Sequence, residues 1–151
     1  MNGQFRNMVS ADVTRVVAIE RTAQTSPWSR LSFEESLNRD YYCRVLDSDQ
    51  GIVAYHTCSS VLDEVHILNV VVADHCQGQG FGHEIMQDIF DYALSLAAKK
   101  MLLEVRAGNH IAQHLYASWG FEQLSLRRKY YQPIEGSGDR EDAVVMLRLL
   151  E

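Results

Sequence analysis

A glycine-rich stretch in the middle of the chain constrains the fold more than any other segment. Residues 69–82 read N-V-V-V-A-D-H-C-Q-G-Q-G-F-G, an apolar run, a short polar loop and three alternating glycines, and a long helical pattern follows. Such a turn is suited to hold phosphate, because glycine lets backbone N–H groups approach an anion and the helix N-terminus adds partial positive charge. A tight turn without a ligand would use the same glycines, so the loop by itself leaves both interpretations open.

Regular hydrophobic periodicity follows the glycines. Residues 81–98 place Phe81, Ile85 and Ile89 on one face, which predicts an amphipathic helix. Four further elements are expected after it: a strand at 101–105, a helix at 109–119, and strands at 121–131 and 143–149. A polar loop at 132–140 separates the last two strands.

The first half of the chain is expected to hold two helices and four strands. Asp12 is the predicted N-cap of the first helix, and Ser32 that of the second, with Glu35 completing a capping box. The strands are expected at 5–9, 42–46, 52–61 and 65–73. The last of these is apolar nearly throughout, which predicts burial on both faces.

The order of these elements predicts a mixed α/β fold. Helices, an antiparallel meander and a strand–helix–strand–helix–strand–strand series give three layers around one central mixed β-sheet. The strands at 65–73 and 101–105 are expected to be parallel neighbours joined by a right-handed crossover. The length of 151 residues suits a single domain over residues 1–151.

Composition narrows the classes of partner. The formal charge of −6 disfavours nucleic acid and is compatible with a cationic peptide. No apolar run reaches the roughly 20 residues that cross a bilayer, and residues 1–10 lack a signal-peptide core, so we expect a cytoplasmic protein away from membranes. We also expect it to be a monomer. Three cysteines, Cys43, Cys58 and Cys76, form no C-x-x-C pair, which predicts free thiols.

Three polar residues after the glycines are candidates for chemistry. Glu104 lies between Leu103 and Val105 in the short strand, where alternation alone would also produce an exposed glutamate. Asn109 stands at a helix start, where an N-cap is the ordinary role. Tyr116 follows seven residues later, nearly two turns on, so it shares a helix face with Asn109, and an aromatic at the edge of the core is its ordinary role.

Together these features resemble a known family. The spacing Gln77-x-x-Gly80-x-Gly82 and the segment L-E-V-R-A-G-N-H-I-A-Q-H-L-Y-A-S-W-G-F are similar to the signature of the GNAT superfamily of acetyl-CoA-dependent N-acetyltransferases. Within it, the chain resembles the bacterial ribosomal-protein alanine N-acetyltransferases. Five short motifs in the same order carry that likeness: S-P-W-S at 26–29, L-D-E at 62–64, L-E-V-R at 103–106, R-x-Y-Y at 128–131 and E-D-A at 141–143.

The resemblance implies roles for individual residues. Glu104 would be the proton acceptor and Tyr116 the proton donor. Because nothing requires a protein nucleophile, direct attack in a ternary complex is the simpler mechanism. Acetyl-CoA would be the co-substrate, and no metal is implied. Residues implied to bind it are Val70, Val71, Val72, Gly78, Gln79, Gly80, Phe81, Gly82, His83 and Asn109.

The expected acceptor is the basic N-terminal peptide of a small-subunit ribosomal protein that begins with alanine. Residues expected near it are Trp28, Asp63, Glu64, Tyr130 and Tyr131. Two positions depart from the commoner family pattern: Gly78 stands where many members carry arginine, and His83 where many carry another basic or small residue. Backbone amides would therefore carry more of the phosphate binding.

Other functions share parts of this pattern. A dinucleotide-binding oxidoreductase would use a similar turn, but the loop reads G-x-G-x-G rather than G-x-G-x-x-G, and the meander before it does not fit a doubly wound sheet. A CoA-binding module without activity would not need both Glu104 and Tyr116. An acetyltransferase for lysine or small amines is compatible with the fold. His110 and His114 lie one helical turn apart, but no third metal ligand stands out.

Overall fold

The structure is a computed structural model that describes residues 3–131 and 141–150, with only the backbone of Lys129, Tyr130 and Tyr131. It forms two compact units. The first comprises Met1–Ser59 and Leu68–Tyr92, and the second Ser60–Ile67 and Ala93–Glu151. Seven strands follow the order β1-β2-β3-β4-β5-β7-β6 in one mixed sheet, which confirms the predicted fold class. The strands β3 and β4 continue from one unit into the other.

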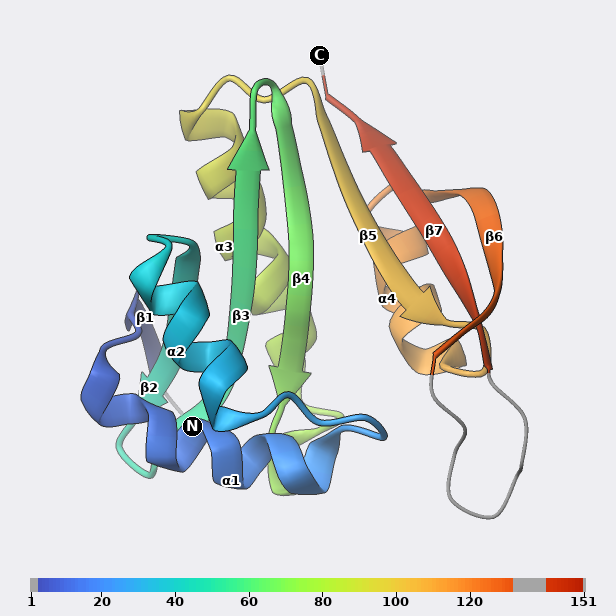
Figure 1. The fold of residues 1–151 in the computed structure, drawn as a ribbon. Coiled ribbons are helices and arrows are strands. Elements are labelled where there is room, and N and C mark those ends of the chain that lie inside the picture. Colours follow the sequence, from blue (N-terminus) through green and yellow to red (C-terminus); the bar gives the residue numbers. More distant parts are fainter. Residues whose placement is uncertain (1–2, 132–140, 151) are drawn as a thin grey trace. The chain divides into compact units, whose positions relative to one another are not determined.

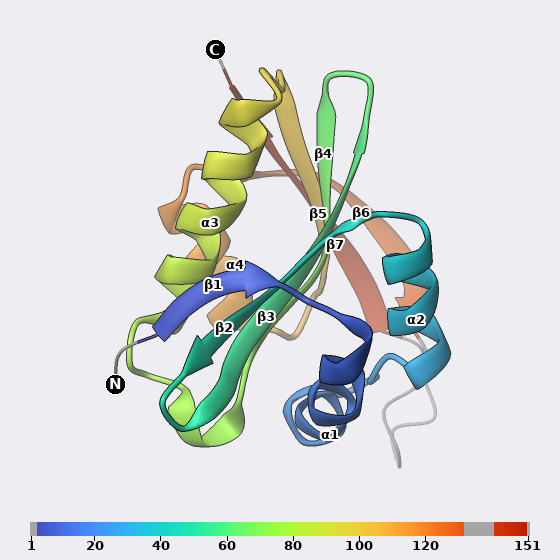
Figure 2. The ribbon, with the colours of Figure 1, turned by 90° about the vertical axis from the view of Figure 1, so that its left-hand side faces the viewer.

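The first unit consists of three layers (Figures 1 and 2). Its strands have helices α1 and α2 on one side and helix α3 on the other. Its elements are β1 (Gly3–Asn7), a 3-10 turn η1 (Ser10–Asp12), α1 (Val13–Ala23), α2 (Arg30–Asn38), β2 (Tyr42–Ser48), most of β3 (Gly51–Val61), the end of β4 (Glu64–Val72), a 3-10 turn η2 (Asp74–Cys76) and most of α3 (Phe81–Ser95). Fully buried side chains from each layer, such as Val16, Tyr55 and Ile85, form its core.

The second unit is built on three strands and one helix. These elements are β5 (Lys100–Arg106), α4 (His110–Ser118), β6 (Glu122–Tyr131) and β7 (Glu141–Leu149), joined by the ends of β3 and α3 and the start of β4. Figure 1 shows α4 behind the strands of this unit. The start of β4 pairs in parallel with β5, as the sequence predicts, with Val65 opposite Met101. Strand β7 runs antiparallel between β5 and β6.

Three local predictions are wrong. Asp12 makes no side-chain cap for α1, because its carboxylate accepts hydrogen bonds from Arg6 and from the backbone N–H of Val9. The N-cap of α2 is Ser29 rather than Ser32, and its hydroxyl accepts from the Ser32 N–H.

Burial is the third correction. Strand β4 alternates between buried and more exposed positions instead of being covered on both faces. Continuous burial belongs to β3, where every residue from Ile52 to Cys58 is buried.

The remaining elements match their predictions within a few residues. Asn109 is the N-cap of α4, and Gly120 follows the helix with a φ of 86°. All three cysteines are free and buried. No helix among residues 3–131 and 141–150 has the length and apolar character needed to cross a membrane. The polar loop expected at 132–140 lies outside the described residues.

Candidate active site

In the first unit, the end of β4 leads into the glycine loop. Val71 is buried, whereas Val70 and Val72 are partly exposed. The carbonyl oxygen of Val72 accepts from the Gln77 side-chain amide at 3.3 Å. This bond ties the start of the loop back to the strand.

The backbone of the loop is open and adopts conformations that favour glycine. Gly78 and Gly80 have φ angles of 78° and 88°, in the left-handed region that favours glycine. A Cβ atom built on either residue would meet nothing within 4 Å, so the loop faces open space. Gln79 between them is also exposed. These residues therefore present backbone that a bulky group can approach.

Helix α3 begins directly behind this loop. Phe81 is buried and anchors its first turn, and the carbonyl oxygen of Gly80 accepts from the N–H of His83 at 3.1 Å. The first N–H groups of an α-helix have no partner within the helix and carry its positive dipole end. Gly82 lies within the first turn of α3, and its φ is not among the positive ones. The arrangement suits a pyrophosphate.

In the second unit, Glu104 lies on the exposed side of β5. Its neighbours Leu103 and Val105 are buried, whereas its own side chain is 33% exposed. Oε1 accepts a hydrogen bond of 2.6 Å from Nη1 of Arg127 on β6. Both residues flank β7 on one face, since Val145 is opposite Glu104 and Ser125, and Ala143 is opposite Arg127.

Asn109 and Tyr116 occupy different environments on α4. The Asn109 side chain accepts from the N–H of Ala112 at 3.2 Å, so its N-cap role is confirmed while the residue stays exposed. Tyr116 is buried, with its ring 6.1 Å from that of Phe121. Tyr116 therefore belongs to the helix layer of this unit, and Glu104 to the exposed strand face.

The residues predicted to meet the acceptor are distributed over both units. Trp28 is partly buried, with its ring 5.2 Å from that of Phe33. The carboxylate of Glu64 lies 3.6 Å from Nζ of Lys100 and 3.2 Å from Nε2 of His66. The backbone oxygen of Asp63 accepts from Lys99.

Glu64 is level with Lys100, which lies roughly 13 Å along β5 from Glu104 at the usual rise of a strand. Its role toward the acceptor stays a prediction. The side chains of Tyr130 and Tyr131 lie outside the described residues.

Two residues that the sequence analysis missed make prominent contacts. Arg127 pairs with Glu104, and Glu20 lies fully buried in the first unit. A signal for Glu20 existed, because it continues the stripe of Val13, Val16 and Val17 on the apolar face of α1. The sequence marked Arg127 only as part of the basic run Arg127-Arg128-Lys129, which is typical of a solvated strand edge. The pairing with Glu104 was missed because that residue lies on a strand distant in the chain.

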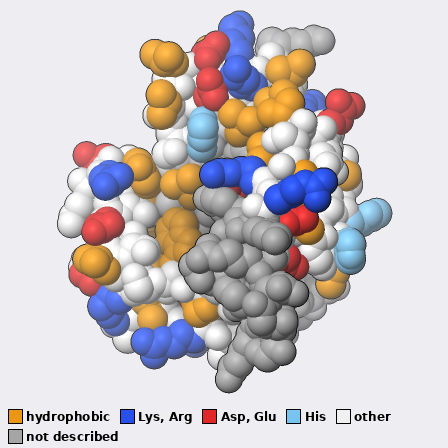
Figure 3. All heavy atoms as spheres, turned by 45° about the vertical axis from the view of Figure 1, so that its right-hand side comes forward, with side chains coloured by type: hydrophobic (Ala, Val, Ile, Leu, Met, Phe, Trp, Pro, Cys, Tyr) orange, Lys and Arg blue, Asp and Glu red, His pale blue; other side chains and the backbone are white. Residues whose placement is uncertain are grey.

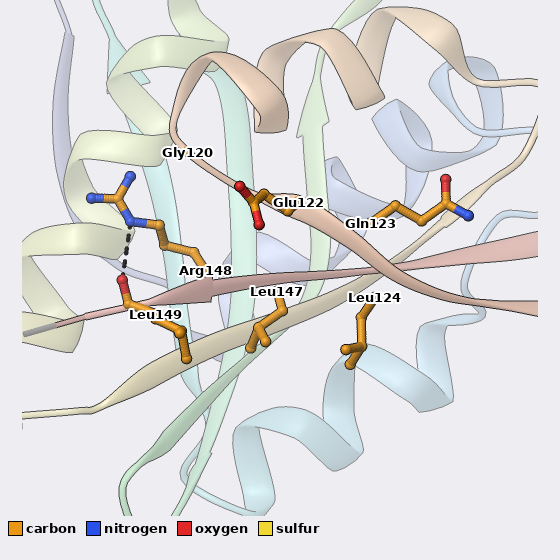
Figure 4. Close-up of a pocket in the computed structure, with 7 residues that line it drawn as sticks. All are labelled: Gly120, Glu122, Gln123, Leu124, Leu147, Arg148 and Leu149. Atoms are coloured by element: carbon orange, nitrogen blue, oxygen red, sulfur yellow. Dashed lines mark hydrogen bonds between the residues drawn. The ribbon is translucent and has the colours of Figure 1, made fainter.

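The pocket of the second unit does not coincide with the predicted site residues. A shallow pocket of about 380 Å³ lies where β6 begins and β7 ends. Figure 4 shows the side chains of Leu124, Leu147 and Leu149, which project from these two strands. None of the predicted site residues lines it.

Within the described parts of the chain, no group of three or more metal-ligating side chains occurs. On the face in Figure 3, basic side chains are interspersed with acidic and apolar ones.

Comparison with known proteins gives a consistent result. The model of the acetyltransferase (GNAT) family matches residues 13–121. A protein of Haemophilus ducreyi named [ribosomal protein bS18]-alanine N-acetyltransferase is 32% identical over 142 residues, covering 94% of this chain and 97% of its own.

Solved structures agree with this assignment. The crystal structure of the ribosomal-protein-S18-alanine N-acetyltransferase from Escherichia coli superimposes with a TM-score of 0.91 at 29% identity, covering 99% of this chain and 95% of that one. A Sinorhizobium meliloti phosphinothricin acetyltransferase, solved with acetyl-CoA, shares the fold with a TM-score of 0.79 at 19% identity, covering 99% of this chain and 89% of that one. The resemblance found in the sequence is thus confirmed, and the chain belongs to the acetyltransferase (GNAT) family.

Proposed function

We propose that this protein transfers acetyl from acetyl-CoA to the N-terminal alanine amine of the small-subunit ribosomal protein bS18. The observation that carries the proposal is the open, left-handed glycine loop between β4 and α3, in a chain that matches a bS18-alanine N-acetyltransferase over nearly its whole length. A phosphate-binding loop of this shape supports a CoA thioester as donor.

The residues of the glycine loop would hold the donor through backbone groups. Gly78 and Gly80 leave room for pyrophosphate, and the N-terminus of α3 supplies positive potential. Acetyl-CoA supplies the activated carbonyl. A backbone N–H near Val70 to Val72 would polarise that carbonyl and stabilise negative charge on its oxygen.

Glu104 would act as the general base. An α-amine has a pKa of about 7.7–8.0, so much of it is protonated near neutral pH and cannot attack. Glu104 is exposed and able to take that proton, directly or through a water molecule. The amine nitrogen then forms a bond to the carbonyl carbon, and the bond between carbon and sulfur breaks.

Tyr116 would protonate the departing thiolate. A phenol is a suitable proton donor, and the buried ring of Tyr116 packs 6.1 Å from that of Phe121. No side chain needs to be acetylated along the way, so direct transfer in a ternary complex is the simplest course.

Steady-state kinetics with three peptides test this function. The first begins with the alanine-started sequence of bS18, the second replaces that alanine with a bulky residue, and the third has a blocked N-terminus and a free lysine. We expect kcat/KM for the first to exceed the others by at least about tenfold, the factor that corresponds to 1.4 kcal/mol. Equal values for the first and third peptides would overturn the assignment in favour of lysine acetylation.

A second experiment tests the cellular substrate. Small-subunit ribosomal proteins are compared by mass spectrometry between cells with and without this protein. In cells that lack it, bS18 should have one acetyl group fewer at its N-terminus. An unchanged bS18 mass would contradict the proposal even if peptides are acetylated in solution.

A further inference from the structure

Glu20 is a fully buried carboxylate at the centre of a hydrogen-bond network in the first unit. Oε2 accepts from the backbone N–H of Trp28 at 2.9 Å, and Oε1 accepts from the Tyr55 hydroxyl at 2.7 Å. The side-chain amide of Asn69 donates to both oxygens, at 3.2 and 3.3 Å. These donors come from the segment between α1 and α2, from β3 and from β4, respectively.

All of these donors are neutral. No Lys, Arg or His of the described residues forms an ion pair with Glu20, although the side chain is 0% exposed. Burial raises the pKa of Glu20, and the hydrogen bonds from Trp28, Tyr55 and Asn69 act against that shift. An apolar residue would fill the same space at lower cost in desolvation, so an acid here serves geometry rather than burial.

The network fixes the segment between α1 and α2 at two points. Glu20 holds the backbone of Trp28, and Asn69 accepts from the Gln24 side-chain amide at 2.7 Å. Between these anchors, Thr25, Ser26 and Pro27 are exposed. The Trp28 ring rests on Phe33, which meets Tyr55 edge-on at 6.0 Å.

Both anchors connect the segment to β4, which we call the donor strand because Val70 to Val72 are proposed to bind the acetyl donor. Asn69 is 6% exposed and directly precedes Val70 to Val72, the stretch of β4 assigned to the thioester. The exposed residues of the segment are therefore held beside the place where an acceptor amine must arrive. A segment that moved would change the entry for the acceptor while leaving the glycine loop, which follows β4, unaltered.

We infer that Glu20 is a positioning residue for the acceptor peptide: through Trp28 and Asn69 it holds residues 24–29 against the donor strand. This inference rests on the proposed transfer reaction. It predicts that loss of the carboxylate weakens the use of the peptide and largely spares the binding of acetyl-CoA, because neither Glu20 nor its hydrogen-bond partners belong to the glycine loop proposed to hold the pyrophosphate.

Fluorescence provides a test that does not depend on activity. The chain has two tryptophans, Trp28 and Trp119, so Trp119→Phe leaves Trp28 as the single reporter of the segment. In that background we expect Glu20→Gln to shift Trp28 emission to longer wavelength, because the indole becomes more exposed to solvent. The KM for the alanine-started peptide should rise about tenfold, equivalent to 1.4 kcal/mol. The Kd for acetyl-CoA, measured by calorimetry, should stay within about twofold.

Asp12→Asn is the matched control. Asp12 is the other buried acid near α1, but it pairs with Arg6 and holds no part of residues 24–29. This variant should lose stability without changing Trp28 emission or peptide KM. Gln24→Ala, which removes the outer anchor at a partly exposed position, replaces Glu20→Gln if the latter does not fold, and the same shifts are expected.

The outcomes separate the two proposals. Unchanged emission and KM in Glu20→Gln, or equal changes in Asp12→Asn, would overturn the positioning role. If the wild type acetylates no peptide, the proposed function fails, and the emission shift alone then decides whether Glu20 holds the segment.

Discussion

The guanidinium of Arg127 lies 2.6 Å from the carboxylate of Glu104, across the intervening strand β7. The proposed base thus has a cation as its neighbour before any substrate arrives. Both side chains are open to solvent, at 50% and 33% exposure, so the pair is weak enough for a substrate ammonium to replace the guanidinium. In the structure, Oε1 of Glu104 faces Nη1 of Arg127.

Replacement of Arg127 should therefore have a modest effect. We expect Arg127→Gln to lower kcat/KM by at most about fivefold, since exposed ion pairs contribute ~0.2–1 kcal/mol. Arg127→Lys should recover part of the loss because the charge is kept. Steady-state assays at low and high salt check this, and a loss of a hundredfold would mean that Arg127 itself takes part in the chemistry.

The proposed acid and base should be far more sensitive. Glu104→Gln and Tyr116→Phe are each expected to lower kcat by about 10²–10⁴-fold, the usual contribution of a general acid or base. Both changes keep the shape of the side chain, and phenylalanine retains the ring contact with Phe121.

Glu122→Gln, an exposed glutamate at the start of β6, serves as the control and should have normal activity. Circular dichroism should show that all three variants are folded. Rates close to that of the wild type for the first two would remove the assigned roles.

The glycine loop can be tested against a glycine of the same geometry elsewhere. Gly80 and Gly51 have φ angles of 88° and 91°, and an added Cβ meets no atom within 4 Å at either position. Valine at either site should cost at least about 1–2 kcal/mol of backbone strain and lower Tm similarly. Only Gly80→Val should also weaken CoA binding, by tenfold or more, because its side chain occupies the space for pyrophosphate. Equal CoA affinities in calorimetry would contradict the loop assignment.

His56 predicts a dependence of stability on pH. It is fully buried, with Nε2 2.7 Å from Asp88, and burial lowers its pKa although the hydrogen bond to Asp88 raises it. The unfolded state, with a histidine pKa of about 6.5, then binds more protons than the folded state below that pH. Stability is therefore lost as the pH falls through about 6.5.

We expect thermal melts to show a steeper fall in Tm from about pH 7.5 to about 5.5 for the wild type than for His56→Gln. Glu20, whose pKa burial raises, contributes with the opposite sign, since its protonation favours the folded state. That contribution is present in both proteins and cancels in the comparison. Parallel curves would show that His56 is not the group responsible.

Short-range signals in the sequence predicted much of this molecule. The glycines after β4, the apolar stripe of α3 and the cap at Asn109 depend on residues close in the chain, so their consequences are local. The motif that carries Glu104 and Tyr116 is also contiguous, so the sequence could nominate both residues as candidates, and their roles stay a prediction. The order of helices and strands then limited the fold to one mixed sheet.

The sequence could not decide which of several suitable residues would act as an N-cap, or which donor a given carboxylate would bind. Ser29 and Ser32 are both good N-caps, and the position of the chain before α2 decides for Ser29. Asp12 is a good cap by type, yet Arg6 from β1 takes its carboxylate. The apolar run of β4 looks doubly buried, but Leu68 is left 40% exposed.

What the sequence by itself determined, then, is the family, the fold and the residue types at the candidate site. What only the tertiary structure decided is which distant groups those residues meet. Glu20 finds Trp28, Tyr55 and Asn69, and Glu104 finds Arg127, through strand pairing and helix packing that no local pattern encodes. The physical reason is that a buried or paired carboxylate takes its hydrogen bonds from whatever donors the folded chain brings within about 3 Å, regardless of their distance in sequence.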